Sequence, residues 1–461
     1  MPDIVLTHGF FLDEDPKEQE IMRPYPPLGL LYISSYLKSA GIKPQIFDST
    51  FSDRSSFEEL LQTLDCGLLG IYTTHMTRSS VVAQIEAAKK EEFIVIVGGP
   101  DSAGYPEEYL NNGADVVVIG EGEAALAEII PLVKAGKYSS DNLQGVAGLI
   151  YQDHNGKIVR TAPRDLLEIN SISWPDRESI DLDRYIEAWH TSHGETSVNL
   201  ITSRGCRYGC RWCSHSVFGN TERRRAVSDC ADEVEWIKKR YNPDQLWYAD
   251  DVFTMDHQWL FEFSAELQKR DLIIPFETIS RADRMQDPEV VKELAVMGCR
   301  RIWIGSESGS DRILRAMGRG VTSEQICRAV ELSKQQGIET GIFLMWGYEG
   351  ETLDDMALTV EHVKRCLPDI FFTTVVHPIK NTPYFKDISV KLTFPEKWAA
   401  STDKDFVVRG RKSSAFYKAA DRWLKNSVKA VRLKESDPAA AAWCEEEAKE
   451  ARKEAKVLWD E

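Results

Sequence analysis

The stretch Thr202–His215 reads Thr-Ser-Arg-Gly-Cys-Arg-Tyr-Gly-Cys-Arg-Trp-Cys-Ser-His, and it places the thiols of Cys206, Cys210 and Cys213 on one short loop. Thiolate ligands select zinc, copper or an iron–sulfur cluster, and a cubane of four irons needs one ligand for each iron. Three cysteines leave one iron open to a substrate or cofactor. The spacing therefore predicts a reactive [4Fe-4S] cluster rather than a structural metal site.

A zinc site is the alternative for this loop, because His215 could complete a set of four ligands. Structural zinc sites usually draw on two separated cysteine pairs. The other six cysteines are scattered, and each is expected to stand alone: Cys66, Cys230, Cys299, Cys327, Cys366 and Cys444. The loop also follows an apolar run, Val198 to Thr202, and barrel folds place their active sites at the carboxyl ends of such strands.

Length and composition indicate an ordinary globular protein with more than one core, since 461 residues are 43% hydrophobic and 28% charged. The formal net charge of -17 argues against a nucleic-acid partner held by phosphate contacts. No apolar run approaches the ~20 residues that cross a bilayer, and the first residues lack the features of a signal peptide. Because the cysteines form no disulfide-like framework, a cytoplasmic location is expected.

Residues 1–140 alternate short apolar runs with amphipathic stretches, which predicts a doubly wound, Rossmann-like α/β domain with a parallel sheet. Ligands of such domains bind beyond the carboxyl ends of the strands. The residues expected there are Thr73, Thr74, His75, Gly98, Gly99, Gly120 and Glu121. A dinucleotide fingerprint would follow the first strand of the domain, whereas Gly120-x-Gly122-x-x-Ala125 follows the fifth, so nicotinamide binding is not expected.

The remaining chain divides into three segments. Residues 141–195 are predicted to form a hairpin, on the evidence of Asn155-Gly156 between two strand-like runs, and a linker. Residues 196–390 hold six βα units, which predict a partial (β/α)6 barrel of the TIM type, two units short of closure. Residues 391–461 are predicted to be a short helical C-terminal tail, in which the charged helix from Ala439 to Leu458 forms a solvated flank.

Polar and sulfur-bearing side chains follow the strands of the predicted barrel and should therefore meet at one rim. They are Asp250 and Asp251 after the second strand, Glu277 and Arg281 with the third, Ser306 and Glu307 with the fourth, and Met345 with the fifth. The charged run Glu222 to Arg225 is expected to be a solvated surface rather than an anion cradle.

The order of motifs resembles the cobalamin-dependent radical S-adenosylmethionine (SAM) enzymes. The likeness rests on Cys-x3-Cys-x2-Cys with Trp212 before the third cysteine, and on five further motifs. These are Pro-Pro-Leu-Gly-Leu at 26–30, Tyr-Ala-Asp-Asp at 248–251, Ser-Arg-Ala-Asp at 280–283, Trp-Ile-Gly-Ser-Glu-Ser-Gly at 303–309 and Ile-Lys-Asn-Thr-Pro-Tyr at 379–384. It spans roughly residues 1 to 385 and points to the branch of carbon methylases and the anaerobic magnesium-protoporphyrin ester cyclase.

The resemblance implies three cofactors: a [4Fe-4S] cluster on Cys206, Cys210 and Cys213, SAM, and cobalamin. SAM would be contacted by Trp212, Asp250, Asp251, Glu277, Arg281, Ser306, Glu307 and Met345. Its carboxylate suits bidentate pairing with Arg281. Cobalamin would lie against the strand exits at Thr73 to His75, Gly98–Gly99 and Gly120–Glu121. The Asp-x-His-x-x-Gly loop of histidine-ligated cobalamin proteins is absent from residues 1–140, where His8 and His75 are the only histidines.

The expected activity is that of a radical SAM methyltransferase acting on an unactivated carbon of a small molecule, tetrapyrrole or lipid. By resemblance, the reduced cluster cleaves SAM to a 5'-deoxyadenosyl radical and methylcobalamin donates the methyl group, with flavodoxin or ferredoxin as reductant. One alternative is a radical oxidative cyclase or other carbon–carbon bond-forming enzyme with the same cofactors. The other is a cobalamin and iron–sulfur sensor or carrier.

Overall fold

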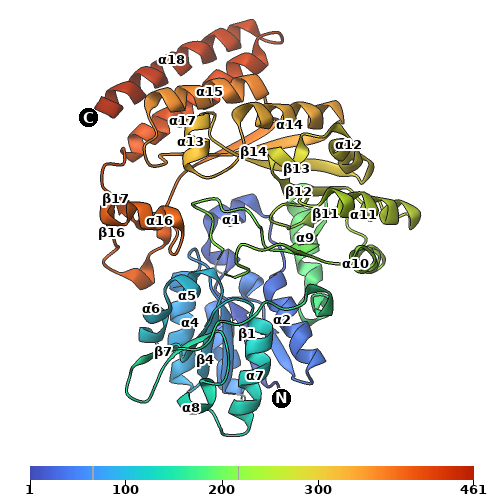
Figure 1. The fold of residues 1–461 in the computed structure, drawn as a ribbon, viewed down its shortest axis with the longest axis vertical. Helices are drawn as coiled ribbons and strands as arrows, with labels where there is room; N and C mark the ends of the chain where they lie inside the picture. The colour runs from blue at the N-terminus through green and yellow to red at the C-terminus, as the bar shows by residue number, and fades with distance from the viewer. Residues whose placement is uncertain (65–66, 216, 461) are drawn as a thin grey trace.

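Two parallel sheets organise the chain, one above the other, in the computed structural model (Figure 1). The structure describes residues 1–64, 67–215 and 217–460. The N-terminal sheet has the strand order β2-β1-β3-β4-β5-β6-β7, and its first five strands in sequence pair in parallel. They are β1 (Ile4–His8), β2 (Pro44–Phe47), β3 (Leu68–Tyr72), β4 (Ile94–Gly98) and β5 (Val116–Val118).

Both faces of the N-terminal sheet are covered by helices, because successive apolar residues of each strand point to opposite faces. Ile4 and Leu6 pack into one buried cluster, with α2 and α7, while Val5 packs into the other, with α3 and α4. This confirms the doubly wound architecture. The helices of the domain are α1 (Pro16–Ile21), α2 (Leu28–Ser39), α3 (Arg54–Thr63), α4 (Arg78–Lys90), α5 (Pro100–Gly104), α6 (Pro106–Asn111), α7 (Gly122–Lys134) and α8 (Ser140–Leu143).

The predicted hairpin forms as β6 (Leu149–Gln152) and β7 (Ile158–Arg160), and it extends the N-terminal sheet by antiparallel pairing with β5. The following segment runs through α9 (Leu182–His193) towards the second domain. Helix α9 is fastened to the first domain, since Tyr185 donates to Asp48 over 2.7 Å and Trp189 donates to the carbonyl of Pro24 over 2.8 Å. The domain boundaries given above remain predictions.

The second sheet has six parallel strands in the order β15-β14-β13-β12-β11-β8. Each strand lies beside the one before it in sequence, as in a barrel that stops before closing, which confirms the predicted partial barrel. The strands are β8 (Ser197–Leu200), β11 (Gln245–Tyr248), β12 (Phe276–Ser280), β13 (Cys299–Glu307), β14 (Glu339–Trp346) and β15 (Ile370–Val375). The outer helices are α10 (Val227–Tyr241), α11 (His257–Lys269), α12 (Pro288–Val296), α13 (Asp311–Ala316), α14 (Ser323–Gln335) and α15 (Leu353–Cys366).

The C-terminal residues form two parts, one packed on the N-terminal domain and one on the barrel. The segment with α16 (Pro383–Ile388), β16 (Leu392–Thr393) and β17 (Val407–Val408) returns to the N-terminal domain, where Phe385 and Phe406 join its buried cluster. Helices α17 (Ser414–Leu433) and α18 (Pro438–Asp460) stack on the outside of the barrel (Figure 1). A stripe of small residues in α18, including Ala448 and Ala455, is buried, so only the outer face of this helix is solvated.

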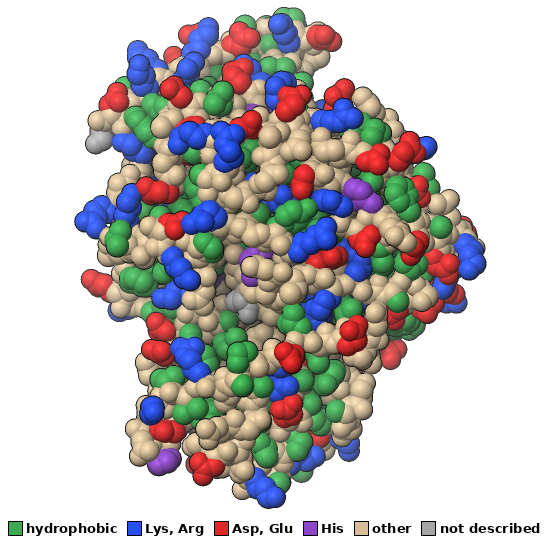
Figure 2. Space-filling model, in the orientation of Figure 1, with side chains coloured by type: hydrophobic (Ala, Val, Ile, Leu, Met, Phe, Trp, Pro, Cys, Tyr) green, Lys and Arg blue, Asp and Glu red, His purple; other side chains and the backbone are tan. Residues whose placement is uncertain are grey.

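On the face drawn in Figure 2, acidic and basic side chains are interspersed. Among the described residues, no helix combines the length and apolar character needed to cross a bilayer.

The expectation that every cysteine outside the loop stands alone was wrong for one pair. Cys327 and Cys366 form a disulfide, because the packing of α14 against α15 brings together residues 39 positions apart. Cys230, Cys299 and Cys444 are unpaired and buried. Cys66 lies outside the described residues.

Candidate functional site

The cysteine loop is closed at its base by a short antiparallel ladder. Strand β9 (Ser203–Arg204) pairs with β10 (Arg223–Arg224), so residues 205–222 form a loop at the carboxyl end of β8. Gly205 has a φ of 85°, and a Cβ built there would lie 2.4 Å from the carbonyl oxygen of Thr221. Only glycine fits this turn, which brings the loop back on itself directly before the first thiol.

Asp250, at the exit of β11, fixes the start of the loop. Its Oδ1 accepts from the backbone N–H of Thr202 over 2.6 Å and of Ser203 over 3.3 Å, and its Oδ2 accepts from the two hydroxyls over 2.5 and 3.0 Å. Arg224 adds an ion pair at 3.5 Å. The carboxylate is 1% exposed. Its neighbour Asp251 is exposed. Asp250 therefore acts on the loop in this geometry, and a contact with SAM remains only a prediction.

Two guanidinium groups face the thiol of Cys210. Arg319 Nη1 lies 3.3 Å from Sγ and Arg281 Nη1 lies 3.6 Å from it. Arg281 also donates to Asp283 over 2.9 Å, and its guanidinium lies 3.6 Å from the ring centroid of Tyr208. The guanidinium of Arg281 thus contacts the carboxylate of Asp283, the backbone carbonyl of Arg319 and the ring of Tyr208. Its Nη1 is directed at the sulfur of Cys210.

The three thiols form a suitable donor set for an anionic iron–sulfur cluster. Cys210 is buried, while Cys206 and Cys213 are half-buried. A hydrogen bond with Cys213 and the charge of Arg319 lower the pKa of the Cys210 thiol, while the same bond raises the pKa of Cys213 and burial raises that of Cys206. Thiolates are the form that binds metal, and hydrogen bonds to cluster sulfurs tune the cluster's potential. The residues present therefore fit a [4Fe-4S] cluster with cationic support at Cys210.

The exit of β13 places Glu307 beside this group. The strand bulges between Gly305 and Glu307, whose φ is 62°. Such backbone geometry is uncommon for a side-chain-bearing residue and is often held at functional sites. The buried Glu307 carboxylate lies 3.6 Å from Arg319, and burial raises its pKa. Glu307, Arg319 and Cys210 thus form one buried chain of charges at the rim.

The remaining predicted SAM contacts do not form one group. Glu277 accepts from Arg301 over 2.6 Å and from Trp303 over 3.0 Å. Ser306 lies 3.1 Å from His362, which belongs to the outer helix α15. Met345 is buried in an apolar cluster against which Trp212 packs. The indole N–H of Trp212 is buried without a hydrogen-bond partner among the described residues, so it could donate to a bound molecule.

A cavity of about 440 Å³ opens where the carboxyl ends of the two sheets face each other. Four of the predicted cobalamin residues line it, namely Gly98, Gly99, Gly120 and Glu121, together with Tyr72, Leu126, Arg204, Val217, Phe218 and Ala249. An adjoining cavity of about 410 Å³ shares Gly120, Glu121, Val217 and Phe218. Glycines at the strand exits and apolar walls suit a large flat ligand whose plane approaches the backbone closely. The lining residues therefore fit cobalamin.

The other predicted cobalamin residues lie beside this cavity rather than in its wall. Thr73 is fully buried and hydrogen-bonded to Ser102 over 3.0 Å, and Thr74 contacts Thr77. The ring of His75 lies tilted against that of His377, with ring centroids 5.3 Å apart. Thr73, Thr74 and His75 therefore do not line this cavity, and their contact with cobalamin remains a prediction. His8, the other histidine of the domain, lies 3.1 Å from Asp48.

The charged run at 222–225 is not a solvated surface, and the expectation was wrong for a physical reason. Strand β10 buries the run between the domains, where each arginine meets a carboxylate. Arg223 and Arg204 both pair with Glu121, over 3.0 and 2.6 Å, and the 4% exposed Arg225 pairs with Glu233. The Glu121 carboxylate, although in the cavity wall, thus ties the first domain to the cysteine loop.

Arg319 was not singled out from the sequence, although it is the cation nearest Cys210. It lies between Gly318 and Gly320, whose φ values are 67° and 65°. A Gly-Arg-Gly triplet is typical of a tight turn, and this is the local signal that the sequence offers. Its partner could not be predicted, because Cys210 is 109 residues away.

Comparison with known families matches both halves of the chain. Residues 20–130 match the B12 binding domain, and residues 200–363 match the radical SAM superfamily. The first match contains the glycine-lined strand exits, and the second contains the cysteine loop. The chain is a cobalamin-dependent radical SAM enzyme. Its cofactors are a [4Fe-4S] cluster, SAM and cobalamin.

Several known proteins are similar to this radical SAM enzyme. An uncharacterised methyltransferase of Pyrococcus horikoshii is 28% identical over 396 residues, covering 83% of each chain. The anaerobic magnesium-protoporphyrin IX monomethyl ester cyclase of Rubrivivax gelatinosus is 25% identical, covering 81% of this chain and 68% of the cyclase. Among solved structures, the cobalamin-dependent SAM radical enzyme OxsB with aqua-cobalamin bound has a TM-score of 0.75 at 18% identity, over 99% of this chain and 72% of OxsB. The comparison with OxsB shows a similar fold only.

Proposed function

We propose that this enzyme is a methyltransferase that methylates an unactivated carbon of a small-molecule or lipid substrate. The observation that carries the proposal is the shared wall of the 440 Å³ cavity. Gly98, Gly99 and Gly120 of the B12 binding domain face Val217 and Phe218 of the cysteine loop across it. A methyl donor on the first side would be within reach of a carbon activated on the second. The similarity to a protein named as a methyltransferase supports the same reading.

When bound, the cluster and SAM supply radical chemistry and cobalamin supplies a transferable methyl group. The chain's own residues hold and shield these groups. Asp250 orders the start of the cysteine loop, Arg281 and Arg319 place positive charge beside Cys210, and the Glu121 pairs keep the loop against the first domain. Such positioning of reactants accounts for much of an enzyme's rate advantage.

The cavity wall also bears on the class of substrate. Most of the side chains in it are aliphatic or aromatic, including Leu126, Val217 and Phe218. Pockets of this kind take ligands with substantial apolar surface. The part of this wall that bound cobalamin leaves uncovered would accordingly meet an apolar portion of the substrate, such as lipids and tetrapyrroles carry. A reductant of the flavodoxin or ferredoxin class would be needed for turnover.

The proposal is tested by anaerobic turnover with deuteriomethyl SAM and a reductant, using candidate apolar substrates chosen from compounds that displace bound fluorescent lipid or porphyrin. A product that carries the labelled methyl group supports methyl transfer. Formation of 5'-deoxyadenosine with label only in methionine contradicts it and supports the oxidative cyclase, which the similarity to the Rubrivivax enzyme favours. Binding of all three cofactors without any cleavage of SAM would instead indicate a sensor or carrier.

The matched variants for this test are Cys210→Ala and Cys230→Ala. Cys210 faces Arg281 and Arg319 in the loop, whereas Cys230 is a buried cysteine in α10. Cys210→Ala is expected to abolish 5'-deoxyadenosine formation, and Cys230→Ala is expected to retain it. Equal activity of the two variants would refute the role given to the loop.

A further inference from the structure

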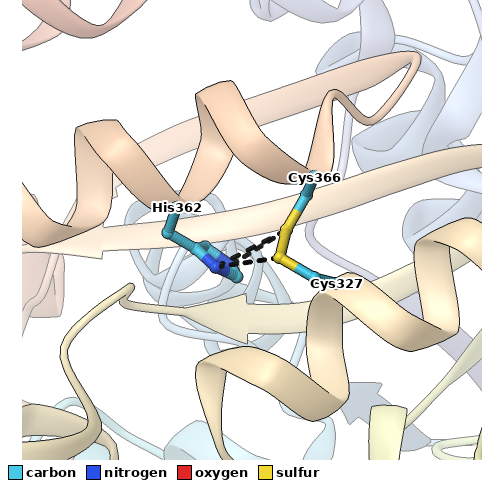
Figure 3. Close-up of side chains that lie close together, drawn as sticks. All are labelled: Cys327, His362 and Cys366. Atoms are coloured by element: carbon cyan, nitrogen blue, oxygen red, sulfur yellow. Dashed lines mark hydrogen bonds between the residues drawn. A yellow bond between two sulfur atoms is a disulfide. The ribbon is translucent and has the colours of Figure 1, made fainter.

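A second group of soft metal ligands lies on the outside of the barrel, away from the cysteine loop. Cys327 comes from α14, and His362 and Cys366 lie one turn apart on α15 (Figure 3). Their ligand atoms all lie within 4.8 Å of one another. The two cysteines are joined as a disulfide, and His362 Nδ1 is 3.5 Å from each sulfur.

The imidazole of His362 has one ring nitrogen close to both sulfurs and the other within reach of a hydroxyl. Its Nδ1 lies 3.5 Å from each sulfur, while its Nε2 lies 3.1 Å from the hydroxyl of Ser306 and 3.8 Å from the sulfur of Cys366. Histidines that bind metal usually use one ring nitrogen for the metal and hold the other in a hydrogen bond, which fixes the ring. The ring is 4% exposed.

Two distances among these atoms match the distances between ligand atoms in a tetrahedral zinc site. With Zn–S of about 2.3 Å and Zn–N of about 2.05 Å, a tetrahedral angle separates nitrogen from sulfur by about 3.5 Å. Both Nδ1–Sγ distances in the structure are 3.5 Å. The third edge, between the sulfurs, would be about 3.8 Å on the same geometry, so zinc can enter only after the disulfide opens.

The helix that carries His362 is held firmly in place. A Cβ built on Gly309, in the loop after β13, would lie 2.5 Å from the Cβ of His362. The backbone N–H of Gly309 donates to Thr359 of the same helix over 2.9 Å. This contact presses α15 against the end of β13 and keeps His362 beside Ser306. Cys327 is only partly buried, which gives a reductant or metal ion a way in from solvent.

We propose that Cys327, His362 and Cys366 form a zinc site in the reduced protein, and that the disulfide is its oxidised, metal-free state. Opening the disulfide takes two electrons and two protons and yields two thiols; a dithiol supplies both and becomes a disulfide, whereas a phosphine supplies the electrons and water the protons, with the oxygen of the water ending in phosphine oxide. Zinc then binds the two thiolates and Nδ1, releasing the two thiol protons, and a water completes the tetrahedron. This site is separate from the proposed methyl transfer, because it uses none of the residues of the cysteine loop or the cavity.

The test uses the full chain with Cys206, Cys210 and Cys213 replaced by alanine, so that the loop thiols cannot compete for metal. The protein is reduced anaerobically with a phosphine, and alkylation with mass spectrometry records whether Cys327 and Cys366 are free thiols. Cobalt(II) is then added as a spectroscopic substitute for zinc. One tightly bound cobalt per chain is expected, with visible bands of a tetrahedral site and a thiolate-to-cobalt band in the near ultraviolet, both lost on adding zinc.

Two further variants in the same background make the assignment specific. Cys327→Ser is expected to abolish the thiolate-to-cobalt band or reduce it by about half, while Cys444→Ser, which removes a buried free cysteine of α18, should leave it unchanged. His362→Gln should weaken cobalt binding and leave both thiols reducible. The proposal is overturned if the thiols are free and no cobalt binds. It is equally overturned if the folded protein keeps its disulfide under the phosphine, or if Cys327→Ser binds cobalt like its parent.

Discussion

Replacing Asp250 separates two roles that the sequence and the structure give to the same carboxylate. From the sequence it is a candidate contact for SAM. In the structure its two oxygens are occupied by Thr202 and Ser203, at the start of the cysteine loop. Asp250→Ala removes this anchor, and Asp250→Asn keeps its shape without its charge.

The size of the effect follows from the bonds that are lost. Asp250→Ala leaves the backbone N–H groups of Thr202 and Ser203 buried without a partner, and each unpaired donor costs about 1–3 kcal/mol. The expected loss of unfolding free energy is therefore about 2–6 kcal/mol. Asp250→Asn retains one oxygen for the two N–H groups and can donate to the hydroxyls. Because charge-assisted hydrogen bonds are roughly twice as strong as neutral ones, a smaller loss of about 1–2 kcal/mol is expected.

The assay pairs urea unfolding of the metal-free protein with iron and sulfide content after anaerobic reconstitution. Asp250→Ala should lose both stability and iron, Asp250→Asn should lose less of each, and the exposed neighbour Asp251→Ala should have the parental stability. The reasoning is refuted if Asp250→Ala keeps the parental stability and iron content but loses affinity for SAM, since the carboxylate would then act on the cofactor and not on the loop.

Three further predictions concern the first domain, its attachment and the barrel rim. Arg78 is 1% exposed and pairs with Asp101 and Asp403, each over 2.7 Å, so Arg78→Met should cost about 3–5 kcal/mol of unfolding free energy by leaving two carboxylates buried and unpaired; a urea-unfolding loss below about 1 kcal/mol would contradict this. Gly98 lines the cavity, and a Cβ there meets nothing closer than 3.8 Å, so Gly98→Ala should bind hydroxocobalamin normally in an ultraviolet–visible titration. Gly98→Leu should bind it about 10–100-fold more weakly because overpacking costs about 1–3 kcal/mol; equal affinities would place the cofactor elsewhere. Burial raises the pKa of Glu351 to about 8, so the folded state holds a proton that the unfolded state releases near pH 4.3. Stability should therefore fall as pH rises between about 4.3 and 8, and Glu351→Gln should flatten this part of a curve of melting temperature against pH; identical curves would show that the carboxyl is solvated.

Much of the architecture was predictable because it depends on local patterns. Runs such as Ile4 to Leu6 are apolar at consecutive positions, which marks a strand covered on both faces. The loop from Cys206 to Cys213 carries three thiols close together in sequence, so the cluster chemistry that it predicts can be inferred without a fold. The glycines at 98, 99 and 120 were likewise found at strand exits, where they line the cavity.

The partners of charged residues were not predictable, because ion pairs join residues that are distant in sequence. The run at 222–225 looked like a solvated surface until β10 placed Arg223 against Glu121, 102 residues away. Asp250 was predicted as a contact for SAM, which stays a prediction, and its hydrogen bond to Thr202 could not be foreseen because the two residues follow different strands. Composition and periodicity contain no information about which carboxylate a buried arginine will meet.

The sequence alone determined the two α/β domains, their order, the three thiols and the family to which the chain belongs, since each is encoded in contiguous residues with a defined period or spacing. Only the tertiary structure decided that Arg319 faces Cys210, that one cavity joins the two domains, and that Cys327 and Cys366 meet beside His362. These features depend on how helices and sheets pack in space. Packing is set by the summed shape of many buried side chains, which no short stretch of sequence records.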